Sequence, residues 1–157
     1  MEKRYYIAYG SNLNVRQMLR RCPGARVLGT AVLTGWELLF KGSGTGSYLT
    51  IEECEDGIVP VVVWEVTASD EAALDRYEGF PNFYYKRDIQ LKYKGIRTGK
   101  HRTVTAFAYI MHEDRLVGVP SNFYMRTCLD GYNTFRFNKN ILIDAYNKCW
   151  EVCGYEE

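Results

Sequence analysis

Residues 4–13 read RYYIAYGSNL, and this stretch joins two different local patterns. Arg4 to Tyr9 is apolar and rich in β-forming residues, and Gly10 ends it, so the segment predicts a buried first strand. From Asn14 to Arg21 apolar residues recur at helical spacing, with an asparagine available as N-cap and two arginines near the C-terminal end. The pattern predicts a strand, a sharp turn and a short helix.

The middle of the chain predicts an antiparallel sheet. Residues 25–41 mix alternating and continuous apolar patterns around Gly35, and the glycine-rich segment Gly42–Ser47 breaks this pattern. The further predicted strands are Tyr48–Glu53, Ile58–Val66, Tyr84–Tyr93 and Thr103–Met111. A turn at Cys54–Gly57 is expected to separate the first two of these strands.

Three later segments have helical character. Ser69 to Glu78 carries acidic residues in its first turn and is followed by Gly79, so Glu78 is expected to be the last helical residue. A second helix is expected to begin at Pro120-Ser121 and to reach about Leu129. After a cap at Asn138, the apolar stripe of a final helix comprises Leu142, Ala145, Cys149 and Val152. This order of strands and helices predicts an α+β fold.

Size and composition exclude several protein classes. The chain has 157 residues, of which 46% are hydrophobic and 25% charged, so residues 1–157 are expected to form a single globular domain. The net charge is +1, which gives no electrostatic argument for nucleic acid or an anionic membrane as partner. The longest apolar run, Ile58 to Trp64, is too short to span a bilayer, and the apolar stretch ending at Gly10 is too short for a secretory signal. A cytoplasmic protein is expected.

Two other sequence features bear on partners. The five cysteines lack the paired spacing of a disulfide framework or a zinc site, so reduced thiols and no metal are expected. A basic stretch from Lys86 to Arg102 is interleaved with tyrosines, which leaves nucleic-acid binding as an alternative. Such a stretch is more often the solvated face of a hairpin.

The first candidate site is the junction formed by Tyr9, Gly10, Ser11, Asn12 and Leu13. Glycine permits a tight turn, and free backbone N–H groups at the start of a helix can bind a carboxylate or an oxyanion. The same residues also suit an ordinary strand-to-helix turn, in which serine or asparagine is a good cap. Both interpretations stay open on spacing alone.

The second candidate is Glu78, within LDRYEGFP at residues 74–81. A carboxylate at a helix C-terminus opposes the helix dipole, and the neighbouring aromatic side chains can withdraw it from water. Both effects predict a raised pKa, which suits a group that carries a proton near neutral pH. The alternative is a solvent-facing glutamate that Arg76 or Arg87 neutralises.

Three motifs in order carry a family resemblance: YGSNL at residues 9–13, LDRYEG at residues 74–79 and PSNFY at residues 120–124. Together they resemble the γ-glutamylcyclotransferase-like family, in particular its short members related to the butirosin-biosynthesis cyclotransferase and the plant avirulence-induced proteins. The resemblance extends from Tyr5 to about Ala145. It implies a small, mixed, mostly antiparallel β-barrel flanked by helices, with one ligand cavity at its mouth.

The resemblance also implies roles for individual residues. The loop Tyr9–Leu13 would hold a γ-glutamyl group largely through backbone amides, and Glu78 would be the catalytic acid and base. Tyr84 matches an aromatic cavity position, although the adjacent Tyr85 leaves a shift of one residue open, and Tyr124 matches another cavity tyrosine. The loop between Glu78 and Tyr84 carries Phe80-Pro81, as in the short members of the family. The substrates of glutathione-degrading or dipeptide-cleaving relatives are therefore not assigned to this chain.

The implied reaction releases an amine from a small-molecule γ-glutamyl substrate and forms 5-oxoproline, with no cofactor or metal. The leaving amine is left open, and a homodimer is a possible assembly because some relatives associate in pairs. An alternative from another class is a non-catalytic module that binds γ-glutamyl compounds on the same scaffold.

Overall fold

The structure is a computed structural model and describes residues 3–43 and 46–154. Its helices and strands, in chain order, are β1 (Arg4–Ala8), the 3-10 helix η1 (Ser11–Leu13), α1 (Val15–Arg21), β2 (Arg26–Ser43), β3 (Gly46–Val66), α2 (Ala68–Glu78), β4 (Tyr84–Gly95), β5 (His101–Met111), β6 (Leu116–Val117), α3 (Asn122–Thr134) and α4 (Lys139–Val152).

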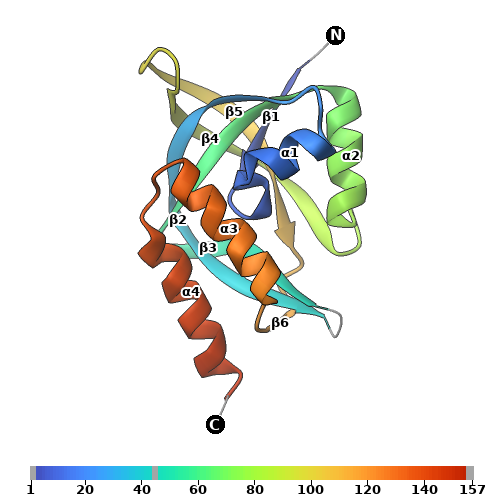
Figure 1. Cartoon of the computed structure of the whole chain (residues 1–157), viewed down its shortest axis with the longest axis vertical. Helices are drawn as coiled ribbons and strands as arrows, with labels where there is room; N and C mark the ends of the chain where they lie inside the picture. The colour runs from blue at the N-terminus through green and yellow to red at the C-terminus, as the bar shows by residue number, and fades with distance from the viewer. Residues whose placement is uncertain (1–2, 44–45, 155–157) are drawn as a thin grey trace.

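In the described residues, five strands close into a barrel (Figure 1). The hydrogen-bonded order is β3-β1-β5-β4-β2, and β2 pairs again with β3 to complete the ring. β1 and β5 are parallel, whereas the other neighbours are antiparallel, and β6 adds a short antiparallel pairing to β2. The α+β class and the mostly antiparallel barrel flanked by helices are confirmed.

β1 is a central element of this barrel. Its residue Tyr6 pairs with Trp64 on β3 and with Phe107 on β5, and the backbone of β1 is therefore bonded on both sides. Ile7 and Ala8 are buried although their side chains point to opposite faces of the strand. Burial on both faces explains the nearly continuous apolar sequence of β1. The end of β1 is thereby fixed where the chain turns into η1.

β3 is longer than the sequence predicts. The expected turn at Cys54–Gly57 is wrong, because the strand continues through it to Val66. Thr34 of β2 pairs with Ile58, and the next paired residue, Trp36, faces Glu53, so residues 54–57 form an irregular bulge. Opposite them Gly35 has φ +86, a conformation that glycine adopts without strain. The bulge bends the β2–β3 pair without reversing the chain.

The predicted ends of α2 are nearly those observed. Thr67 and Asp70 form a reciprocal capping box at its start, and Gly79 adopts the left-handed conformation directly after Glu78. Glu78 is therefore the last residue of the helix, as the sequence indicates.

The two C-terminal helices depart from expectation in two places. α3 continues to Thr134 instead of ending near Leu129, because Gly131 is used for close packing: a Cβ on Gly131 would lie 2.4 Å from Cβ of Leu13. α4 buries Leu142, Ala145 and Cys149 as predicted, but Val152 is 58% exposed. Figure 1 shows the end of α4 extending beyond the barrel, which agrees with the exposure of Val152.

The remaining sequence expectations concern the hairpin, the cysteines and the membrane. The segment Gly42–Ser47 joins β2 to β3, and its residues 44 and 45 lie outside the described part of the chain. All five cysteines are free thiols. Within residues 3–43 and 46–154, no helix has the length and apolar character needed to cross a membrane.

Candidate active site

A cavity of about 280 Å³ opens beside the junction of β1 and η1. It brings together seven of the eight predicted site residues: Tyr9, Gly10, Ser11, Asn12, Glu78, Tyr84 and Tyr124. Sequence reasoning did not place six further lining residues there, namely Tyr6, Tyr48, Leu49, Tyr77, Phe83 and Tyr109. The wall is thus mostly aromatic, and its polar groups are tyrosine hydroxyls, one carboxylate and the loop with its backbone amides.

Leu13 is the predicted residue that the structure does not bring to the cavity. Its side chain is fully buried beneath Gly131 of α3. Its N–H group donates to the carbonyl of Gly10 at 3.0 Å, which closes the 3-10 turn. Leu13 therefore anchors the loop, and its amide is already used.

The loop itself presents unused backbone donors. In the described residues, the N–H groups of Ser11 and Asn12 have no protein acceptor. Gly10 lets the loop approach the opposite wall, because a Cβ there would lie 3.2 Å from the hydroxyl oxygen of Tyr124. A side chain on this residue would narrow the cavity next to both donors.

Asn12 holds the loop in place through three hydrogen bonds. Its Nδ2 donates to the Tyr6 hydroxyl at 2.9 Å, its Oδ1 accepts from the Arg21 guanidinium, and its carbonyl accepts from Nε1 of Trp64 at 3.2 Å. The residue is only 3% exposed. A buried amide with all these partners is rigid, because each broken bond would leave a buried polar group unsatisfied.

Glu78 stands at the end of α2 on the cavity wall. Among the described side chains, no hydrogen bond or ion pair involves its carboxylate, and Arg87 pairs instead with Glu53 at 2.7 Å. Burial raises the pKa of Glu78 to about 8, and the positive charge of Arg21 opposes this rise. The carboxyl group can therefore exchange a proton near neutral pH.

Arg21 occupies the outer side of the same wall. Its guanidinium carbon lies 3.4 Å from the centroid of the Tyr77 ring, in a stacked contact between a cation and an aromatic face. The Tyr77 hydroxyl is in turn 3.1 Å from Oγ of Ser11. These contacts join α2 to α1 and to the loop, although Tyr77 and Ser11 are 66 positions apart in the sequence.

The two predicted tyrosines bracket Leu49 of β3. The Tyr84 hydroxyl donates to the Leu49 carbonyl at 2.8 Å, and the Leu49 N–H donates to the Tyr124 hydroxyl at 3.1 Å. Tyr85 instead donates its hydroxyl proton to Glu113 at 2.5 Å, outside the cavity. The structure thus places Tyr84, and not Tyr85, at the site.

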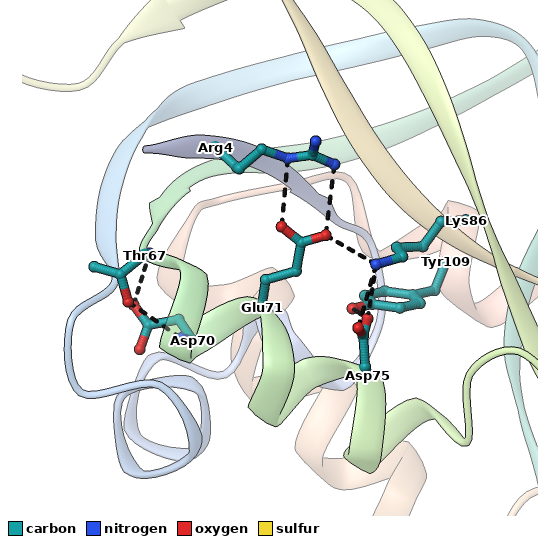
Figure 2. Close-up of polar contacts among 7 residues, drawn as sticks. All are labelled: Arg4, Thr67, Asp70, Glu71, Asp75, Lys86 and Tyr109. Atoms are coloured by element: carbon teal, nitrogen blue, oxygen red, sulfur yellow. Dashed lines mark hydrogen bonds and ion pairs between the residues drawn. The ribbon is translucent and has the colours of Figure 1, made fainter. Parts of the chain in front are cut away.

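A charged network ties α2 to three strands of the barrel (Figure 2). Glu71 lies 3.3 Å from Nε of Arg4 on β1 and 2.8 Å from Nζ of Lys86 on β4. Asp75, one turn later, lies 3.0 Å from Lys86 and accepts a hydrogen bond of 2.6 Å from the hydroxyl of Tyr109 on β5. Burial lowers the pKa of Lys86, but its hydrogen bonds to both carboxylates outweigh this effect and raise it.

The sequence matches the family described as "Gamma-glutamyl cyclotransferase, AIG2-like" over residues 6–126, which is more than half of the chain. The protein belongs to this family. The matched range includes both the loop after β1 and the end of α2, and it reaches Tyr124 near the start of α3. No curated protein sequence gives a significant match.

Solved structures agree with this membership in the γ-glutamyl cyclotransferase family. A γ-glutamyl cyclotransferase is 26% identical with a TM-score of 0.71, over 94% of this chain and 86% of that one. An uncharacterised human protein is also 26% identical with a TM-score of 0.71, over 95% of this chain and 87% of its own. A yeast γ-glutamyl cyclotransferase specific to glutathione is 12% identical with a TM-score of 0.62, over 95% and 97%, and this likeness shows the fold alone.

Proposed function

We propose that this family member is an active γ-glutamyl cyclotransferase that converts a small γ-glutamyl compound into 5-oxoproline and a free amine. The observation that carries the proposal is the Glu78 carboxylate, which faces the cavity without a protein partner in the described residues and has a pKa of about 8. Enzymes often place a group with such a shifted pKa where it must move a proton.

The reaction needs a proton to leave one nitrogen and to reach another. The α-amine of the substrate attacks its own γ-carbonyl carbon, a C–N bond forms in a five-membered ring, and the bond to the leaving amine breaks. Glu78 first takes one proton of the α-ammonium group and then returns it to the departing nitrogen. The ring nitrogen still carries one proton too many after the attack, and this second proton also passes to the released amine, which leaves as an ammonium ion. Since an α-amino group has an ordinary pKa near 8, the two proton affinities are closely matched.

The loop supplies the second part of the mechanism. We place the substrate carboxylate or the developing oxyanion against the free N–H groups of Ser11 and Asn12, because they are fixed donors with no other acceptor among the described residues. The loss of one such donor costs roughly 3 to 4 kcal/mol in known enzymes. The bonds of Asn12 to Tyr6, Arg21 and Trp64 keep these donors in position before the substrate arrives.

The substrate is not specified beyond its γ-glutamyl group. The experiment is therefore incubation of the purified protein with a panel of γ-glutamyl amino acids and amines, with 5-oxoproline measured by mass spectrometry. Glu78→Gln should form no product, whereas Glu55→Gln, an exposed carboxylate outside the cavity, should behave as wild type. Ligands that stabilise the wild-type protein without being consumed would favour the non-catalytic binding module instead.

A further inference from the structure

Three tyrosines on the cavity wall donate their hydroxyl protons in hydrogen bonds to other groups of the protein. Tyr9 donates to the carbonyl of Tyr109 at 2.6 Å, and Tyr84 donates to the carbonyl of Leu49 at 2.8 Å. Tyr109 donates to Oδ1 of Asp75 at 2.6 Å. A phenol has a single proton, so each of these oxygens has only lone pairs left for a ligand.

The direction of the Tyr109 bond is the most firmly fixed of the three. Its acceptor is a carboxylate, and the O···O distance lies in the range of charge-assisted hydrogen bonds. Lys86 lies 3.0 Å from the same oxygen of Asp75 and balances its charge. If the Tyr109 proton turned away from Asp75, two acceptors would face each other at close range.

We propose that Tyr9, Tyr84 and Tyr109, together with Glu78, form the wall that binds the primary ammonium group of the substrate, and that Asp75 is a positioning residue that keeps Tyr109 an acceptor. The inference rests on the proposed function, because the ammonium group is the α-amine of the γ-glutamyl compound. An ammonium group has three donors and no acceptor, which complements this wall.

The same argument orients the substrate in the cavity. A carboxylate against the tyrosine wall would meet only the lone pairs of the three hydroxyl oxygens, whereas the N–H groups of Ser11 and Asn12 are donors. The α-carboxylate therefore lies toward the loop and the α-amine toward Glu78. This orientation puts the attacking nitrogen beside the group that takes its proton.

The test compares two ligands that differ in the amine alone. γ-Glutamyl methylamide carries the α-amine and a small leaving group, and glutaric acid monomethylamide has the same amide but lacks the α-amine. Binding of both is measured by calorimetry in the Glu78→Gln background, which stops turnover and isolates the contribution of the tyrosines. We expect the amine-bearing ligand to bind at least tenfold more tightly.

Two further substitutions address Tyr109 and Asp75 separately. Tyr109→Phe should lower the affinity for γ-glutamyl methylamide several-fold and leave the affinity for glutaric acid monomethylamide unchanged. Asp75→Asn should also lower the affinity for the amine-bearing ligand alone. The asparagine amide can rotate and donate to the Tyr109 oxygen, which then no longer accepts a hydrogen bond from the ammonium group. Glu71→Gln is the matched control: it weakens the same network but does not contact Tyr109, so the preference should remain.

The outcomes separate this inference from the proposed function. The inference is overturned if neither ligand is preferred, including the case in which neither binds, or if Tyr109→Phe and Asp75→Asn weaken both ligands equally. Equal loss of preference in Glu71→Gln would also overturn it, because the network would then have only a structural role. If the preference holds but wild type forms no 5-oxoproline, the ammonium wall stands and the catalytic proposal fails.

Discussion

Replacing Glu78 with glutamine should make the protein more stable at the same time as it stops turnover. Glutamine has nearly the same shape and is neutral at every pH, whereas the wild-type carboxyl group must be accommodated in a cavity that disfavours its charge. Burial raises the pKa of Glu78 from its ordinary value of 4.5 to about 8 in the folded protein. The unfolded chain carries no such penalty, so ionisation favours unfolding.

The magnitude follows from the difference between the two pKa values. Below pH 4.5 the group is neutral in both states, and its contribution to stability is fully present. Between pH 4.5 and about 8 the unfolded chain ionises first, and the free energy of unfolding falls by about 1.4 kcal/mol per pH unit. The loss reaches about 3 kcal/mol at pH 7 and about 5 kcal/mol above pH 8.

Urea unfolding of wild type and Glu78→Gln at several pH values from 4 to 9 measures this difference. The two stabilities should be similar at pH 4 and diverge steadily up to pH 8, with the variant the more stable. Glu55→Gln, changed at an exposed residue of β3, should follow wild type throughout. A constant difference between wild type and Glu78→Gln over this pH range would refute the reasoning, because it would mean that the carboxyl group titrates alike in both states.

Three other outcomes are expected. The kcat/KM of wild type should rise with pH through about 8, because the free enzyme must carry ionised Glu78 to accept the substrate proton; a profile already level from pH 6 would contradict this role. Arg21→Gln should move that rise to higher pH, because it removes the positive charge that opposes the raised pKa of Glu78; an unmoved profile would exclude this influence. Gly131→Ala should lower the free energy of unfolding by about 1 to 3 kcal/mol, since the added Cβ would lie 2.4 Å from Cβ of Leu13, and equilibrium unfolding that matches wild type would contradict this.

The local elements were predictable where one residue has one dominant conformational effect. Gly79 in the left-handed conformation and the Thr67 cap set the ends of α2, and both follow from short-range preferences. The bulge in β3 was not predictable in this way, because Cys54–Gly57 resembles a turn in sequence. Pairing with β2 keeps the segment extended, and that pairing is a property of the barrel.

The residues of the candidate site were also only partly predictable from the sequence. The motif resemblance pointed to Glu78 and to the loop after β1, and these residues line one cavity. Tyr6, Tyr48 and Tyr109 were missed because nothing local distinguishes a tyrosine on a cavity wall from one in the core of a sheet. Tyr77 had a usable indication, since it directly precedes Glu78 at the end of α2.

The position of β1 between β3 and β5 has a consequence for biosynthesis. β1 leaves the ribosome well before β5, which is one of its two neighbours in the barrel, and Tyr9 donates to the carbonyl of Tyr109, 100 positions later in the chain. A nascent chain therefore has an apolar first strand whose full set of partners has not yet been made, and closure of the barrel depends on contacts of long sequence separation, which form slowly. The cavity is complete only once Tyr124 has emerged, so nascent chains that end before α3 are expected to lack a finished site.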